Sequence, residues 1–311
     1  MPRMNETPLT QEQKARLMRQ ATYASTATAS VLIVAKLIAW LMSDSVSLLA
    51  TLIDSSLDVL ASMLNLLAVR HALTPADKQH RFGHGKAEAL AGLGQATFIA
   101  GSAAFLFLEA ISRFLHPVEI HAVGVGVFVM VFSIAATVGL MMFQNHVIRM
   151  TGSTAIKADA LHYKTDLLVN GSVIAALLLA TYGWAGFDAV FGLAIAFYII
   201  YSAWEIVREA LGHLMDKELS LEDREKIKEI ALRHRETRGM HDLRTRQSGT
   251  TVFIQLHLEL DPKLTLLQAH SISDEVEVAL MKAYPDAEVI IHEDPAGLKE
   301  PMPVFVDAEN H

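Results

Sequence analysis

The sequence contains no cysteine, and this absence limits its metal chemistry. Disulfide bridges and thiolate metal sites are both excluded, so any bound metal must use histidine, aspartate or glutamate ligands. Such ligands suit zinc, iron or manganese better than Cu(I), which prefers soft sulfur donors.

The chain is also poor in charge, and the charge that it has is mostly negative. Charged residues make up 19% of the 311 residues and hydrophobic residues 52%, with a mean hydropathy of +0.31. This composition is too apolar for an ordinary soluble domain and indicates a polytopic membrane protein with a soluble part. The formal net charge of −8 argues against nucleic acid as a partner.

Motifs for nucleotide-driven or hydrolytic chemistry are missing. Gly85-Lys86 looks like the end of a phosphate-binding loop, but the upstream glycine is absent and Ala87 replaces the residue that would hold magnesium. No His-Glu-x-x-His pattern appears either. Any transport by this chain would therefore be driven by an ion gradient. An intramembrane metalloenzyme and a membrane-anchored metal sensor stay open as other function classes.

Six apolar stretches are long enough to cross a bilayer core of about 30 Å. They cover residues 22–42, 46–69, 90–115, 122–146, 156–181 and 186–208. Lys and Arg are concentrated in the N-terminal segment and in the loops after the second and fourth apolar stretches. The loops on the opposite side of the membrane have almost none, and Arg113 near the end of the third stretch is the exception. This bias predicts that both termini are cytoplasmic. The polar segment 1–20 is interpreted as a cytoplasmic lead-in to a transmembrane domain over 21–210, because it lacks a signal-peptide cleavage pattern.

The composition changes near residue 211, where a second domain is predicted over 211–297. A helix over 221–235, strands over 241–247 and 251–260, a helix over 264–283 and a strand over 288–292 give the order αββαβ. The fold class is thus an α-helical membrane protein with six spans, followed by a small α+β, metallochaperone-like cytoplasmic domain. The tail 298–311 is Pro-rich and acidic and is predicted to be disordered.

Two pairs of metal-ligand side chains lie one helical turn apart inside apolar stretches. Asp54 and Asp58 form the first pair, and His162 and Asp166 form the second. Each charged group at bilayer depth costs roughly 2.5–3.5 kcal/mol on insertion scales, so a compensating ligand is expected. Hydrogen bonding to neighbouring polar groups is the alternative. Asp159 on the same stripe either supports the ligands or packs between helices.

The charge of these four side chains links metal binding to protons. Three carboxylates and a neutral histidine carry −3, and a dication leaves −1. An empty site of this charge in apolar surroundings should hold protons, which the metal must expel. We therefore expect metal–proton exchange, with His162 as the main proton-coupling residue because imidazole titrates near neutral pH.

Further ligand-type residues occur in a loop and in the soluble domain. Asp77, His80 and His84 have plausible ligand spacing, although a solvated polar loop explains them equally well. The soluble domain adds five candidates, at His241, His257, His270, His292 and Asp294. His257 lies on a predicted strand and His292–Asp294 comes at the end of the next one, so these residues are expected to lie side by side.

Several segments together resemble the cation diffusion facilitator family, and within it the bacterial zinc and ferrous-iron efflux transporters. The similarity covers residues 20–296. The segments that carry it are Leu52–Asp58, Pro75–Asp77, Phe82–Glu88, Ala158–Asp166, His241–Gly249 and Ile290–Pro295.

The resemblance implies a homodimer in the bacterial inner membrane that exports Zn²⁺ or Cd²⁺, and in some members Fe²⁺, in exchange for protons. It implies no enzyme activity and no organic cofactor, with zinc both transported and held structurally. By this likeness the transport site comprises Asp54, Asp58, His162 and Asp166, and the loop site comprises Asp77, His80 and His84. The binuclear cytoplasmic site comprises His241, His257, His292 and Asp294, with His270 contributed by the partner subunit. Leu161 falls on the gate position, and Lys86 and Asp216 fall on a charge interlock.

Overall fold

The computed structural model describes residues 9–43, 46–115, 124–181, 187–285 and 287–298. The side chains of several helical positions within these ranges, Asp54 among them, lie outside the description, as do residues 299–311 of the predicted tail 298–311. The chain divides into two compact units. One is Glu12–Leu214, and the other combines Met215–His311 with Met1–Gln11.

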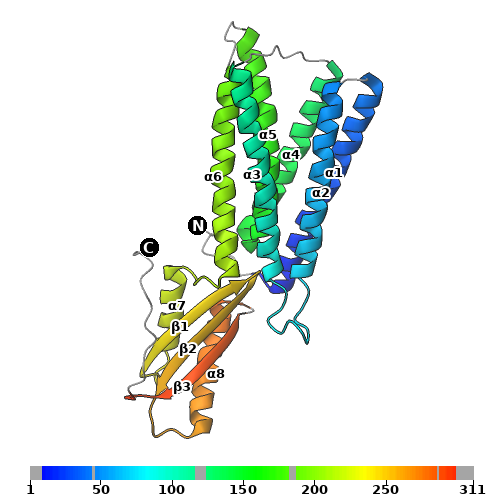
Figure 1. Ribbon diagram of the computed structural model, residues 1–311. Helices are drawn as coiled ribbons and strands as arrows, with labels where there is room; N and C mark the ends of the chain where they lie inside the picture. Colours follow the sequence, from blue (N-terminus) through cyan, green and yellow to red (C-terminus); the bar gives the residue numbers. More distant parts are fainter. Residues whose placement is uncertain (1–8, 44–45, 116–123, 182–186, 286, 299–311) are drawn as a thin grey trace. The chain divides into compact units, whose positions relative to one another are not determined.

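Six long helices make up the first unit (Figure 1). They are α1 (Gln11–Ser43), α2 (Val46–Ala72), α3 (Lys86–Leu115), α4 (Gly124–Thr151), α5 (Thr154–Thr181) and α6 (Phe187–Leu214). Each predicted apolar stretch corresponds to one helix. α1 begins well before the stretch at residue 22, because its polar first turns consist largely of good helix formers that a hydropathy pattern does not detect.

Four of these helices are long and apolar enough to span a membrane within their described residues. These segments are Gln11–Met42, Lys86–Ser112, Phe128–Thr151 and Val190–Leu214, which belong to α1, α3, α4 and α6. The prediction of six spans is therefore confirmed for four. Parts of α2 and the second half of α5 have side chains outside the description, so the spans predicted there stay predictions.

The helical unit is held together by small residues at close helix crossings. α3 packs most extensively against α6, and α5 contacts α3, α4 and α6. At Gly192 on α6, an added Cβ would lie 3.0 Å from the Cβ of Ala110 on α3. Only glycine allows this approach without displacement, so the α3–α6 pair is closely packed.

The second unit is a three-stranded sheet with two helices. Its elements are α7 (Leu221–Leu232), β1 (Gly239–Ser248), β2 (Thr251–Leu260), α8 (Leu266–Ala283) and β3 (Glu288–Pro295). The strand order is β1-β2-β3, with β1 antiparallel and β3 parallel to β2. The predicted order αββαβ is confirmed, and β3 runs three residues past the predicted end, to Pro295.

Alternation along β2 separates the two faces of this sheet. Ile254, Leu256 and Leu258 are buried in one core with α7 and α8. The intervening residues, including His257 and Glu259, therefore lie on the opposite face. Among the described residues, the helices α7 and α8 both pack on the apolar face, so neither covers the polar face of the sheet.

Candidate metal-binding sites

Asp58, His162 and Asp166 come together between α2 and α5. His162 Nε2 lies 3.0 Å from Asp58 Oδ1, and ligand atoms of all three residues lie within 4.8 Å of one another. The His162 and Asp58 side chains are 14% and 21% exposed. Asp166 follows His162 by one turn, so both project from the same side of α5. The side chain of Asp54, the predicted fourth member, is outside the description.

A buried hydroxyl cluster lies next to these three residues and joins three helices. The Tyr163 hydroxyl lies 2.9 Å from Ser62 Oγ on α2 and donates to the Ser25 carbonyl on α1 at 3.1 Å. Tyr163 directly follows His162, and Ser62 follows Asp58 by one turn. The cluster therefore fixes the register of α2 against α5 at the level of the ligands.

Asp159 is fully buried and accepts two hydrogen bonds from side-chain amides. Gln95 Nε2 on α3 donates at 3.2 Å and Gln144 Nε2 on α4 donates at 2.7 Å. Of the two interpretations left open by the sequence, helix packing accounts for these contacts. Gln95 and Gln144 were not predicted, although amides inside apolar stretches were the available signal.

The predicted loop residues Asp77, His80 and His84 also come together, between α2 and α3. Asp77 Oδ1 lies 3.5 Å from His80 Nδ1, and Asp77 Oδ2 lies 3.5 Å from His84 Nε2. Asp77 Oδ1 accepts backbone N–H groups of Gln79 and His80 at 2.8 and 2.7 Å. These bonds lower the pKa of Asp77, so its carboxylate stays ionised and available to a cation.

Strand register creates a third group on the polar face of the sheet. His241 pairs with His257 across β1 and β2, and His257 pairs with His292 across β2 and β3. His257 Nδ1 lies 2.7 Å from Asp294 Oδ2, and His241 Nε2 lies 3.4 Å from the same oxygen. His241, His257 and Asp294 thus form a compact set of ligand atoms.

The remaining soluble-domain candidates lie differently. His292 Nε2 is 3.2 Å from Asp294 Oδ1 but its side chain is 64% exposed. His270 on α8 is 65% exposed and lies 3.6 Å from Asp274 instead of joining the sheet group. Glu259, which was not predicted as a site residue, contacts His241 Nδ1 at 3.0 Å. Its place on the same β2 face as His257 was the signal for it.

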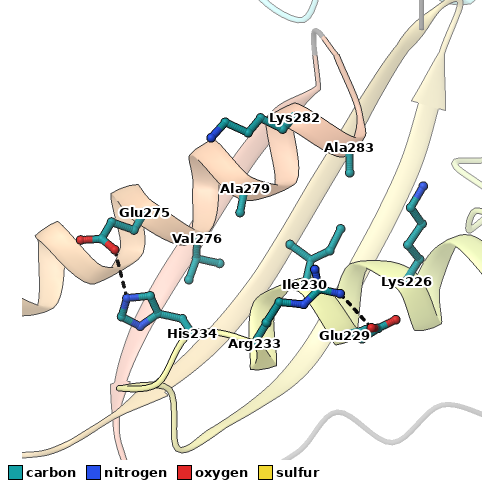
Figure 2. A pocket seen from close by; sticks show the side chains of 10 residues that line it. All are labelled: Lys226, Glu229, Ile230, Arg233, His234, Glu275, Val276, Ala279, Lys282 and Ala283. Carbon is teal, nitrogen blue, oxygen red and sulfur yellow. Dashed lines mark hydrogen bonds and ion pairs between the residues drawn. The ribbon is translucent and has the colours of Figure 1, made fainter. Parts of the chain in front are cut away.

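A groove lies between α7 and α8, with a volume of about 640 Å³ (Figure 2). His234 pairs with Glu275 across it at 3.2 Å, and Arg233 pairs with Glu229 along α7 at 2.8 Å. Because both helices cover the sheet face opposite to the histidines, the groove is separate from the sheet group. Its charged side chains of both signs largely pair with one another.

The predicted gate and interlock residues have clear neighbours within their own units. Leu161 is buried in a cluster with residues of α3 and α6, such as Ile99 and Ile199. Lys86 Nζ donates to the Leu214 carbonyl at 3.3 Å. Asp216 belongs to the other unit and accepts from Arg246 at 3.3 Å. A pairing of Lys86 with Asp216 stays a prediction.

Family models and known relatives match nearly the whole chain. Residues 22–215 match the cation efflux transmembrane domain, and residues 219–296 match the cytoplasmic domain of cation efflux proteins. The cation-efflux pump FieF of Klebsiella pneumoniae is 49% identical over 283 residues, or 91% of this chain and 94% of that protein. The FieF pump of Serratia proteamaculans is 48% identical over 92% of this chain and 95% of its own length.

A solved structure of the metal-bound C-terminal domain of the CzcD transporter from Thermotoga maritima is 26% identical. It covers 26% of this chain and 100% of its own, with a TM-score of 0.25. The assignment therefore depends on the family models and the full-length relatives, which agree in both units. The chain belongs to the cation efflux, or cation diffusion facilitator, family of membrane transporters, and it is a transporter rather than an enzyme.

Proposed function

We propose that this protein exports Zn²⁺ and Cd²⁺, with Fe²⁺ as a further candidate substrate, from the cytoplasm in exchange for protons. The observation that carries the proposal is the meeting of Asp58, His162 and Asp166 between two helices of a membrane unit. Membership of an efflux family favours transport over the sensor and metalloenzyme alternatives.

The chemistry of this ligand set suits zinc. Zinc prefers four nitrogen or oxygen ligands in tetrahedral geometry, and Asp54, one turn before Asp58, is the proposed fourth. A set with all four ligands from protein leaves no open coordination position, so it favours binding and release over catalysis. The imidazole of His162 favours zinc over manganese, for which an all-oxygen set is better suited.

Proton exchange follows from charge. Asp58 Oδ1 and His162 Nε2 lie 3.0 Å apart, so one proton between them is stabilised when no cation is present. A dication entering the site competes with that proton for the same atoms. Binding must therefore release protons, and protonation from the other side must release the metal. Switching between inward- and outward-open states then couples the two flows.

The other two groups are proposed to hold resident metal. His241, His257, His292 and Asp294 would form the cytoplasmic centre, and Asp77, His80 and His84 the loop centre. The nitrogen and carboxylate donors of both groups fit Zn²⁺. We further propose a homodimer, with His270 contributed by the partner subunit. We also propose that the protein lies in the inner membrane with both termini in the cytoplasm. Its transmembrane domain covers residues 21–210 and its cytoplasmic domain covers residues 211–297.

Zinc flux in reconstituted vesicles tests the site assignment. Asp58→Asn keeps the side-chain shape but removes one ligand charge, so we expect Zn²⁺ flux to fall about 100-fold or more. Glu205→Gln removes a carboxylate from the exposed side of α6 and is the matched control, expected to transport normally. Equal flux in the wild-type protein and in Asp58→Asn would refute the assignment.

A further inference from the structure

The last turn of α2 carries a histidine outside the predicted loop pattern. The ring of His71 lies with its centroid 4.7 Å from that of His84, at an interplanar angle of 63°. The rings of His80 and His84 lie 4.6 Å apart. Three imidazoles and the Asp77 carboxylate therefore gather where α2 ends and the loop begins.

Hydrogen bonds to Thr74 connect the backbone of His71 with the ring of His84. The Thr74 N–H donates to the His71 carbonyl at 3.0 Å, and the Thr74 carbonyl lies 3.3 Å from His84 Nδ1. A carbonyl only accepts hydrogen bonds, so His84 must carry its proton on Nδ1 for this contact to form. His84 Nε2 then presents a lone pair on the side of Asp77, as a metal ligand requires.

The three residues predicted for the loop leave a coordination position to be filled. Their ligand atoms lie within 4.8 Å of one another, whereas structural zinc sites almost always use four protein ligands. His71 is exposed, so rotation of its side chain is cheap, and its ring already contacts that of His84. Among the described residues, the group with this spacing holds Asp77, His80 and His84 alone, and His71 joins it once its side chain rotates.

We propose that His71 is the fourth ligand of the loop centre and closes it as a tetrahedral three-histidine, one-aspartate zinc site. The inference depends on the proposed metal-binding role of Asp77, His80 and His84. A closed site retains its metal instead of passing it on. It also ties the C-terminal end of α2, the helix that carries Asp58, to the loop that leads into α3.

Cobalt substitution in the full-length protein tests this ligand. The background carries Asp58→Ala, His162→Ala, His241→Ala and His257→Ala, which leave the loop as the remaining centre. In this background, His71→Phe keeps an aromatic ring but removes the ligand atom. His146→Phe, at an exposed position of α4, is the control. We expect intense visible absorption of four-coordinate Co²⁺ in the background and in the control. His71→Phe should weaken both the absorption and Zn²⁺ competition, the latter at least about tenfold.

A second variant gives a positive signal. Because the chain has no cysteine, His71→Cys introduces a unique thiol, and coordination through it adds a thiolate-to-cobalt charge-transfer band. Unchanged spectra and affinity in His71→Phe, with no such band in His71→Cys, would overturn the inference and leave a three-ligand loop centre. A background that binds no Co²⁺, with the same spectrum before and after Asp77→Ala, would show that the loop residues hold no metal. That result would overturn the proposed loop centre together with this inference.

Discussion

His162 and Asp58 show how single residues give an apolar helix pair its chemistry. Each would be costly in a membrane, yet their side chains meet at 3.0 Å and share a third ligand candidate, Asp166. Mutual contact alone lowers that cost, since opposite charges stabilise one another. A metal ion that replaces the proton would lower it further, which is why these residues carry the proposed function.

Replacing His162 by Asp should change metal selectivity. The variant presents only oxygen ligands, which suit Mn²⁺ better than an imidazole-containing set does. We expect the ratio of Zn²⁺ to Mn²⁺ flux in vesicles to fall by about tenfold or more. His146→Asp, at an exposed position of α4, should leave the ratio unchanged. An unaltered ratio in His162→Asp would show that His162 does not set the selectivity for Zn²⁺ over Mn²⁺.

Sequence spacing predicted these ligand pairs because helix geometry is regular. Residues four apart share a face, so Asp58, His162 and Asp166 needed only that α2 and α5 be neighbours. The same spacing did not predict Gln95, Gln144 or Ser62. Their partners lie on a different helix, and sequence spacing does not fix how far one helix is shifted along another. His71 was not predicted because it lies on α2, and a turn of the chain after α2 brings its ring to His84.

At the scale of elements, α5 is positioned by polar contacts of Asp159 and Tyr163, which lie close to its candidate ligands. Tyr163 joins it to α1 and α2, and Asp159 joins it to α3 and α4. Buried polar contacts of this kind fix one register between helices, because a shift would leave the groups without partners. The meeting of Asp58, His162 and Asp166 therefore depends on the contacts of Tyr163 and Asp159.

Removing the Gln144 amide should weaken this arrangement. Gln144→Leu deprives the buried Asp159 carboxylate of its 2.7 Å donor, which we expect to cost about 1–3 kcal/mol of unfolding free energy. Asn145→Leu, on the exposed neighbouring position, should cost far less. Thermal unfolding in detergent measures both variants. Identical melting temperatures would mean that the amide does not stabilise α4 against α5.

In the second unit, Tyr284 joins the end of α8 to the start of α7. Its hydroxyl donates to Asp223, with the carboxylate Oδ1 at 3.1 Å and the backbone carbonyl at 3.2 Å. Burial and the Asp223 charge raise the pKa of Tyr284 above that of an unfolded tyrosine, about 10. The protonated hydroxyl therefore stabilises the fold fully below about pH 10, and this contribution is lost as the pH rises through the higher folded-state pKa.

Tyr284→Phe tests this dependence. At pH 8 the variant should be less stable by about 1 kcal/mol, the contribution of one hydrogen bond. Above about pH 10 the difference from the wild-type protein should shrink, because only the wild-type protein loses stability by ionisation. Hydrogen exchange in α7 and α8, compared at equal pH, measures the gap. A gap that stays constant up to about pH 11 would contradict the assignment.

At the scale of the whole molecule, the two units have separate tasks. The helical unit holds Asp58, His162 and Asp166 within apolar helices, and the α+β unit holds a row of histidines on the sheet face opposite α7 and α8. Composition predicted this division because hydropathy changes abruptly near residue 211. The six predicted spans are confirmed for four helices, because parts of α2 and α5 lie outside the described residues.

The most direct test of the central claim measures Zn²⁺ and proton movement together in vesicles that contain the full-length protein. If metal and protons compete for Asp58 and His162, an outward-to-inward proton gradient should drive Zn²⁺ in the opposite direction, and reversing the gradient should reverse the zinc flux. Collapse of the gradient should leave only flux down the zinc gradient, with measurable counterflow of protons. Zinc flux that is indifferent to the size and direction of the proton gradient, with no proton counterflow, would contradict proton-coupled export.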